Sequence, residues 1–418
     1  MVRERLSEYE TRYRILAAEV AAEIILANTP GPQTVEVPLL EAGGLVLAAD
    51  AIAFENMPPF PSSSVDGYAV IASDQTAVRQ VLGEITAGHP DELEVTPGTV
   101  ARIMTGAPVP RGADAVVMLE ATQDVGDGQG SPAITIDRAV SPGDYIHPVG
   151  QDLTTDQIIL RAGSLLGPPE IGLLATIGLT HVRVFRRPVI SVLSTGDELV
   201  EPDQALRPGA IRDSNRYALM SAVRSANCEA RSAGMVRDSQ DAQETAIRRA
   251  LADSDVVLTS GGVSVGSRDL IKPILERLGT VHFGRIAMKP GKPLTFATVG
   301  QKLVFGLPGF PVSSLVTFEV FVRPALLKLQ GRREVHRPRV EVVLAHDLKQ
   351  TPDRTEYQRV AVTWENGQLV ARGTGLQVSS RLLSMVGANA LVVIQPGTGV
   401  ISAGSLVPAL LTGDILAT

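Results

Sequence analysis

The stretch Ser254–Gly279 combines residue types that suit the binding of an anion. A short apolar run, Val256–Thr259, is followed at once by two glycines and then by a segment with helical spacing. Paired glycines let the backbone approach a ligand closely, and a helix that begins just beyond them adds partial positive charge. This pattern predicts a phosphate site, although an ordinary turn that needs glycine for its geometry is the alternative. The residues of the predicted site are Ser260, Gly261, Gly262, Ser264 and Gly266.

Two lysines, Lys289 and Lys292, lie in a loop that Pro290, Gly291 and Pro293 make rigid. Ammonium groups held by such a backbone favour a role in binding over plain solvation at the surface. The chain has a net charge of −7, so any anion that it holds must be met by local cations of this kind. We therefore expect both lysines to bind the anion, and Arg285 to extend the basic cluster.

Three carboxylates, Glu198, Asp238 and Asp269, lie where predicted strands end or predicted helices begin. Capping of a helix would explain Asp238, and compensation of a helix dipole would explain Asp269, whereas Glu198 has no such structural explanation. Carboxylates beside a lysine pair would repel an anion unless a cation lay between them. A bound Mg²⁺ with Glu198 and Asp269 as ligands would bridge carboxylates to phosphate oxygens.

The composition limits the partners of the chain. A length of 418 residues predicts two to four domains, and the acidic balance with only 4% aromatic residues argues against binding of nucleic acid. The single cysteine, Cys228, excludes a disulfide within the chain and a cysteine-rich zinc site, which suits a reducing cytoplasm. No stretch has the length and apolarity of a membrane span, so we expect no membrane partner.

The helices and strands that must position these residues can be predicted from the pattern of apolar residues along the chain. From Val182 to about Arg333, apolar runs alternate with helical spacing, which is typical of a doubly wound, mostly parallel sheet. Three unusual loops, Thr195–Glu198, Ser260–Gly262 and Leu307–Pro311, each follow a predicted strand. Because ligands bind beyond the carboxyl ends of such strands, we expect the loops to share one edge and one site.

The flanking regions have different patterns. Residues 5–28 have an apolar stripe with helical spacing, and residues 55–149 show short strands separated by turn signals, which predicts a β-rich module. Residues 338–418 again show short alternating runs and predict a small β-barrel or sandwich.

Six motifs occur in a fixed order along almost the whole chain. They are SVDGYAV at 64–70, TGAPVP at 105–110, STGDEL at 194–199, TSGGVSVG at 259–266, MKPGKP at 288–293 and LPGFP at 307–311. This pattern resembles the MoeA family of molybdopterin molybdenumtransferases, which is related to the C-terminal domain of gephyrin. The resemblance implies a multidomain α/β fold whose central doubly wound domain is of the molybdopterin-binding type.

The resemblance also implies domains, an activity and a set of site residues. Its four domains would be an elongated helical or mixed domain (1–54 with 150–181), the β-rich module (55–149), the α/β domain (182–333) and a C-terminal β-barrel (334–418). The implied activity is insertion of molybdate into adenylylated molybdopterin, with release of AMP and dependence on Mg²⁺. The implied assembly is a homodimer, with molybdopterin adenylyltransferase as a possible partner, and the implied cleft lies between the α/β domain and the partner's β-rich module.

The positions that match functional residues of the family fall into two groups. Those expected to act in catalysis are Asp66, Thr105, Asp152, Glu198, Asp238 and Asp269. Those expected to bind the pterin substrate, beside the glycine turn, are Lys289, Lys292, Pro308 and Pro311.

The chain departs from the family pattern at a few positions. Pro61-Ser62 stands where Asp-Asn is usual, Phe310 where Asn is usual, and Arg285 where Lys is common. Two alternatives therefore stay open. One is the preceding adenylyl transfer, whose enzyme resembles the α/β domain alone and would not need the other domains. The second is a non-catalytic, molybdopterin-binding or scaffold protein, which the departures favour.

Overall fold

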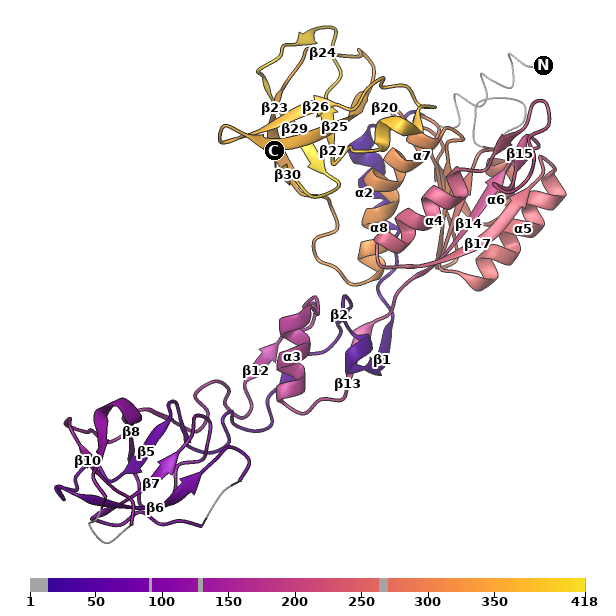
Figure 1. Cartoon of the computed structure of the whole chain (residues 1–418). Helices are drawn as coiled ribbons and strands as arrows, with labels where there is room; N and C mark the ends of the chain where they lie inside the picture. The colour runs from indigo at the N-terminus through magenta and orange to yellow at the C-terminus, as the bar shows by residue number, and fades with distance from the viewer. Residues whose placement is uncertain (1–13, 90–91, 127–130, 263–269, 418) are drawn as a thin grey trace. The chain divides into compact units, whose positions relative to one another are not determined.

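The computed structural model describes residues 14–89, 92–126, 131–262 and 270–417, which form two compact units (Figure 1). The first unit takes in the described residues up to Ala48, the short segment Leu165–Gly167, and the described residues from Val182 onward. The second unit consists of Ala49–Ser164 and Pro168–His181. None of the helices in these ranges is long and apolar enough to cross a membrane.

A six-stranded sheet forms the centre of the first unit, in the order β17-β14-β18-β22-β21-β19. The four strands β17 (Glu229–Val236), β14 (Val189–Thr195), β18 (Val256–Ser260) and β22 (Lys302–Leu307) run parallel to one another. Strand β21 (Thr295–Val299) is antiparallel to both β22 and β19 (Thr280–Phe283). The carboxyl ends of β14, β18 and β22 therefore lie at one edge of the sheet.

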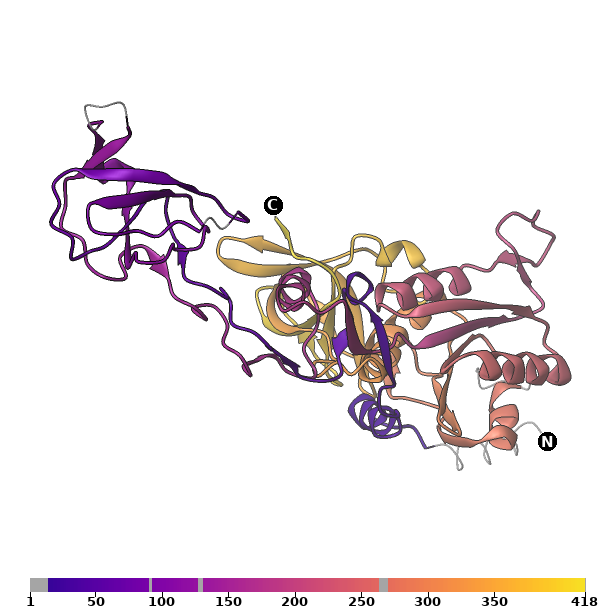
Figure 2. The same cartoon turned by 90° about the horizontal axis from the view of Figure 1, so that it is seen from below.

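Helices cover both faces of this sheet, as Figure 2 shows. Alternate residues of β18 point to opposite faces, so Val256 packs in one apolar cluster with Leu219 of α4, and Val257 in another with Ile247 of α5. The doubly wound, mostly parallel domain expected from the alternating pattern is confirmed. Its helices are α4 (Asn215–Ser225), α5 (Gln240–Asp253), α6 (Ile271–Leu278), α7 (Pro311–Thr317) and α8 (Arg323–Leu329), with a π-helical turn (Phe318–Val322) between the last two.

Helix α2 (Ala18–Ala27) belongs to the same core, because Ala21 and Ile25 pack with Phe321 and Ile286. The sequence predicted a helix from residue 5, but residues 1–13 lie outside the described ranges. After α2 comes a small sheet in the order β1 (Thr34–Pro38), β13 (His181–Phe185) and β2 (Val46–Leu47), with a 3₁₀ turn at Leu39–Glu41. The domain boundaries drawn from the sequence stay a prediction.

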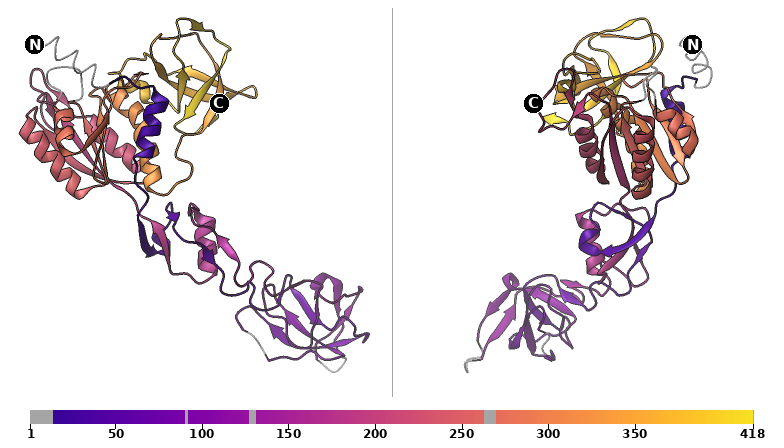
Figure 3. Two further views of the ribbon diagram at one scale, coloured as in Figure 1. Left: turned by 180° about the vertical axis from the view of Figure 1, so that it is seen from behind. Right: turned by 90° about the vertical axis from the view of Figure 1, so that its right-hand side faces the viewer.

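The C-terminal strands close into a barrel, which confirms the second part of the predicted fold (Figure 3). Strand β25 pairs with both β26 and β27, and this closes the ring β25-β26-β23-β29-β27. The short strand β20 (Met288–Lys289) of the lysine loop pairs with the start of β25, so the barrel and the loop are joined. The barrel strands are β23 (Arg339–Leu344), β25 (Thr355–Glu365), β26 (Gln368–Gly373), β27 (Ala390–Ile394) and β29 (Leu406–Leu411). Smaller elements are β24 (Leu348–Lys349), β28 (Val400–Ile401), β30 (Leu416–Ala417) and a 3₁₀ turn at Leu382–Met385.

The second unit is rich in strands, as the turn signals predicted. Its main sheet has the order β8 (Ala115–Met118), β5 (Gly67–Val70), β7 (Thr99–Ile103), β6 (Arg79–Ile85), β10 (Ala133–Ile136) and β9 (Thr122–Asp124). Gly67 permits a close approach of β5 to β8, because a Cβ there would lie 1.9 Å from the carbonyl oxygen of Val117. Smaller elements are β4 (Ser62–Ser63) paired with β11 (Ile146–His147), β3 (Ala51–Ile52) paired with β12 (Ile158–Leu160), helix α3 (Pro168–Thr176) and a 3₁₀ turn at Leu119–Ala121.

A buried carboxylate in this module predicts a loss of stability in acid. Burial alone would raise the pKa of Asp74, but hydrogen bonds from Thr76 and Gly98, with Arg79 alongside, lower this pKa from 3.8 to about 2. The resulting stabilisation is complete above pH 3.8 and is lost as the pH falls through about 2. Over that interval the wild type should lose about 2 kcal/mol more unfolding free energy than Asp74→Asn, as measured by urea unfolding. Parallel pH profiles for the two proteins would contradict the expectation.

Candidate active site

A cavity of about 820 Å³ opens at the carboxyl edge of the α/β sheet. The three loops that were expected to converge all line it, and so does the lysine loop. Its walls include Thr195, Gly196, Glu198, Ser260, Gly261, Gly262, Met288–Pro293 and Pro308–Pro311. Segments more than 100 residues apart in sequence thus line one cavity. This occurs because the loops that follow parallel strands lie at the same edge of the sheet.

The glycine turn after β18 is packed closely against the loop after β14. Gly261 has a φ of +91°, and a Cβ at this position would lie 2.7 Å from the carbonyl oxygen of Thr195. The N–H of Gly261 donates to the carbonyl oxygen of Leu307 at 3.2 Å, which ties this turn to the third loop. Ser264 and Gly266, which were also expected to bind the anion, lie outside the described residues.

Asn215, at the start of α4, joins two of the cavity loops. Its Nδ2 donates to Ser260 Oγ and to the carbonyl oxygen of Gly309, both at 2.7 Å. Asn215 was not singled out from the sequence. The bridge is a consequence of topology, because α4 begins at the same edge at which β18 and β22 end.

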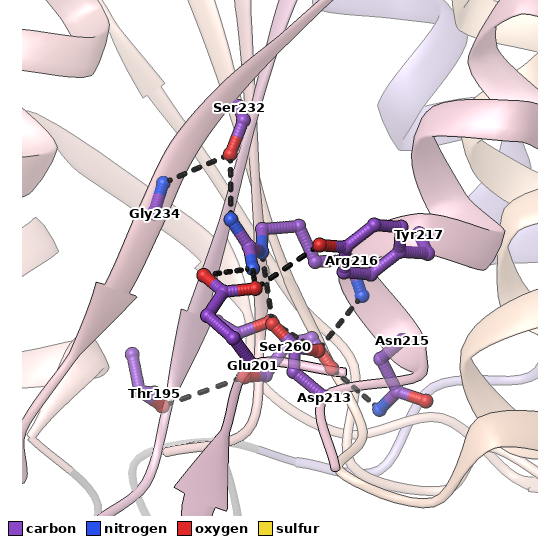
Figure 4. Close-up of polar contacts among 10 residues, drawn as sticks. Thr195, Glu201, Asp213, Asn215, Arg216, Tyr217, Ser232, Gly234 and Ser260 are labelled. Carbon is purple, nitrogen blue, oxygen red and sulfur yellow. Dashed lines mark hydrogen bonds and ion pairs between the residues drawn. The ribbon is translucent and has the colours of Figure 1, made fainter. Parts of the chain in front are cut away.

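An ionic network that reaches the cavity wall at Ser194 and Asp213 fixes the start of α4 (Figure 4). Asp213 Oδ1 accepts a hydrogen bond from Ser194 Oγ at 3.0 Å, and Asp213 Oδ2 accepts one from Arg216 Nε at 2.9 Å. The guanidinium of Arg216 also donates to Glu201 and Ser232. Hydrogen bonds from Arg216 and Tyr217 lower the pKa of Glu201, so this carboxylate stays charged. The sequence did not single out this network, since its members are spread over 39 residues.

The two lysines of the proline-rich loop have different surroundings. Lys289 Nζ lies 3.1 Å from Glu356 Oε1 of the barrel, and the Glu356 side chain is only 4% exposed. Both lysines line the cavity. Arg354, Ser379 and Ser380 of the C-terminal domain line it as well. These three were missed because the sequence of this region indicated only a barrel, without a motif that pointed to a ligand.

Of the expected acidic residues, Glu198 and Asp238 line the cavity, whereas Asp269 lies outside the described residues. Helix α5 begins after Ser239, and Gln243 donates a hydrogen bond to Asp238 Oδ1 at 3.3 Å. Within the described ranges, no group of three or more His, Cys, Asp or Glu side chains could hold a metal ion. Mg²⁺ at substrate phosphates commonly takes only one or two protein carboxylates, so Glu198 beside a turn that is predicted to bind phosphate would suit this ion.

Comparison with known proteins identifies the family. Three family models match in order: the MoeA N-terminal region (domain I and II) over residues 16–178, a probable molybdopterin binding domain over 191–328, and the MoeA C-terminal region (domain IV) over 341–412. A molybdopterin molybdenumtransferase from Haemophilus influenzae is 37% identical over 398 residues, which are 94% of this chain and 98% of that protein. The chain belongs to the MoeA family.

Other MoeA relatives agree with this result. Gephyrin from Dictyostelium discoideum is 35% identical over 96% of this chain, but the chain spans only 63% of that protein. A solved MoeA structure from Pyrococcus horikoshii superposes with a TM-score of 0.82 at 31% identity, covering 96% of this chain and 100% of that one. The resemblance drawn from the six motifs is therefore confirmed, and the chain is a transferase of molybdenum cofactor biosynthesis.

Three of the MoeA positions lie in the second unit. Asp66 Oδ1 accepts hydrogen bonds from the N–H of Thr105 at 2.7 Å and from Thr105 Oγ1 at 2.8 Å. These bonds, with the charge of Arg102 alongside, lower the pKa of Asp66. Asp66 and Thr105 thus form one exposed pair, while Asp152 is exposed elsewhere in this unit and its N–H donates to the carbonyl oxygen of Met57.

The residues that differ from the usual MoeA pattern lie in different parts of the structure. Phe310 lines the cavity, between Gly309 and Pro311. Arg285 is only 6% exposed and is not among the residues that line the cavity, so it does not extend the lysine cluster there. Pro61 and Ser62 lie in the second unit, where Ser62 is buried in strand β4.

Proposed function

We propose that this chain inserts molybdate into adenylylated molybdopterin and releases AMP, in a reaction that depends on Mg²⁺. The observation that carries the proposal is the cavity at the carboxyl edge of the sheet, where a glycine turn, two lysines and Glu198 meet in a chain of the MoeA family. Its size suits a ligand with more than one ring, since pockets for organic ligands typically occupy about 300–1,000 Å³.

The proposed roles follow from the chemistry of each group. Lys289 and Lys292 hold the phosphate oxygens, and the glycines of the turn Ser260–Gly262 let the backbone approach them closely. Pro308 and Pro311 line the same cavity, and Pro311 begins α7 with a fixed φ. Glu198, with Asp269, would hold Mg²⁺, which supplies positive charge that draws electrons from the phosphoanhydride.

The remaining expected residues take part as acids or as positioning groups. We propose that Asp66 and Thr105 act in catalysis from the β-rich module of a second subunit, that Asp152 of the elongated domain also acts in catalysis, and that Asp238 acts beside Glu198. A cytoplasmic homodimer that receives its substrate from molybdopterin adenylyltransferase is part of the same proposal. The support for these residue roles is that the positions match functional positions of the MoeA family.

A direct assay tests the function. The purified protein is incubated with adenylylated molybdopterin and Mg²⁺, with and without molybdate, and released AMP is quantified. AMP release that depends on molybdate is the expected result. Release without dependence on molybdate would indicate adenylyl chemistry, and tight binding of the pterin without turnover would indicate a scaffold. Either outcome would overturn the proposed reaction.

The Asn215 bridge provides a further prediction on this reaction. In Asn215→Asp, a carboxylate oxygen replaces the donor that faces the carbonyl oxygen of Gly309, so the two loops should separate. We expect turnover to fall roughly tenfold, because small errors in the placement of binding groups have large effects on rate. Asn227→Asp is the matched control, since it removes a 2.7 Å bond from Nδ2 to the carbonyl oxygen of Gly44, away from the cavity. Equal turnover in Asn215→Asp and the control would contradict the role.

A further inference from the structure

Phe310 places a large apolar ring in the wall of the cavity. The residue is 60% exposed, although a phenylalanine of this size is normally buried when a core is within reach. Single exposed apolar side chains are common on protein surfaces, so exposure by itself indicates nothing. What distinguishes Phe310 is that it lines the same cavity as Lys289, Lys292 and the glycine turn.

The backbone around Phe310 is held on both sides. Asn215 Nδ2 donates to the carbonyl oxygen of Gly309 at 2.7 Å, and the N–H of Ser314 donates to the carbonyl oxygen of Phe310 at 3.0 Å. The N–H of Val312 donates to the carbonyl oxygen of Ser379, in the C-terminal domain, at 3.1 Å. The ring therefore extends from a fixed backbone, which lowers the conformational entropy that a ligand contact would cost.

The place of Phe310 at the start of α7 also argues against a purely structural role for this side chain. Phe310 is the residue before the first turn of α7, with φ −77° and ψ 132°, and its side chain makes no capping hydrogen bond. Asn, Asp and Ser are preferred at such positions because they bond the free N–H groups of the first turn. Phe310 thus neither caps the helix nor buries its ring, so its identity is better explained by a ligand than by stability.

We propose that Phe310 is a binding residue that stacks on a planar heterocycle of the substrate, an inference that rests on the proposed function. The cavity then has two complementary parts: the lysines and the glycine turn meet the phosphate, and the ring of Phe310 meets the apolar face of the heterocycle. Adenylylated molybdopterin offers two such groups, the pterin and the adenine. Stacking on either uses the same chemistry, and separate ligands distinguish them.

The test measures dissociation constants of AMP, of molybdopterin and of molybdate, which has no ring, for the wild type and variants. Phe310→Ala should weaken binding of at least one ring-bearing ligand by roughly tenfold, because stacking on an aromatic side chain contributes about that much per base. Molybdate binding should not change. Phe310→Leu, which keeps an apolar side chain without a flat face, should resemble Phe310→Ala, and Phe310→Trp should bind like the wild type.

A second variant separates binding from stability. Phe310→Asn supplies the missing cap, so its Tm should rise by about 2 °C while its affinity for the ring-bearing ligand falls as in Phe310→Ala. Wild-type affinity for both ring-bearing ligands in Phe310→Ala would overturn the inference and leave the proposed function standing. Failure of the wild type to bind either of them would overturn both.

Discussion

Lys292→Ala is expected to reduce molybdate-dependent AMP release about a hundredfold with little effect on stability, whereas Lys289→Ala should reduce both. Lys292 and Lys289 line the same cavity, and removal of one charged group that holds a reacting phosphate typically has an effect of this size on turnover. The difference in stability arises because Lys289 pairs with a buried carboxylate of the barrel, at 3.1 Å from Glu356 Oε1, whereas Lys292 has no such pair among the described residues.

The size of this second effect follows from burial. Loss of Lys289 leaves the charge of Glu356, whose side chain is 4% exposed, without its cation. Breaking a fully buried pair costs about 3–5 kcal/mol, and the Lys289 side chain is 42% exposed, so we expect about 2 kcal/mol. Urea unfolding measures this value for each variant.

A double replacement separates the two roles of Lys289. Lys289→Ala combined with Glu356→Gln removes both charges, so the stability should largely return while the activity stays low. Lys349→Ala, which removes an exposed lysine of the C-terminal domain outside the cavity, should match the wild type in both measurements. Full activity in Lys292→Ala would show that this lysine holds no part of the substrate.

Gly261→Ala is expected to abolish measurable turnover. The new Cβ would lie 2.7 Å from the carbonyl oxygen of Thr195, a distance that real Cβ atoms do not tolerate, and the φ of +91° is unfavourable for alanine. The turn must then move away from Thr195, and with it the backbone that is proposed to approach the phosphate. The affinity for molybdopterin should fall at least about tenfold, as measured by equilibrium dialysis.

The control for this replacement is Gly300→Ala in the turn between β21 and β22. Gly300 also has a positive φ, +59°, but a Cβ there would meet no atom within 4 Å. The Gly300→Ala variant should therefore lose about 1 kcal/mol of stability through backbone strain, without any loss of turnover. Equal activity of Gly261→Ala and Gly300→Ala would mean that the glycine turn has no part in binding.

The sequence predicted the α/β domain well because its rules are local. Each of the runs Val189–Leu193, Val256–Thr259 and Val304–Leu307 is apolar, short and followed by a glycine- or proline-rich loop, and parallel strands leave only one edge for such loops. The convergence of Glu198, Gly261 and Lys289 on one cavity follows from that topology.

The contributions of the C-terminal domain could not be predicted in this way. Arg354 and Ser380 reach the cavity because β20 pairs with β25 and because Val312 bonds to Ser379, two long-range contacts that no local pattern encodes. Arg285 shows the opposite error, since its closeness in sequence to the lysine loop suggested a cationic cluster, but its side chain is buried. Asp66 and Thr105 were found only through the family motifs, because an isolated Asp-Gly pair is usually a turn.

Equilibrium dialysis of molybdopterin against the wild type, Lys292→Ala and Lys349→Ala tests the central claim most directly, because it asks whether the phosphate of the pterin is held in this cavity. We predict that Lys292→Ala binds molybdopterin at least about tenfold more weakly than the wild type and Lys349→Ala do. Added salt should reduce this difference in affinity. Equal affinities for all three proteins would contradict the assignment of this cavity as the substrate site.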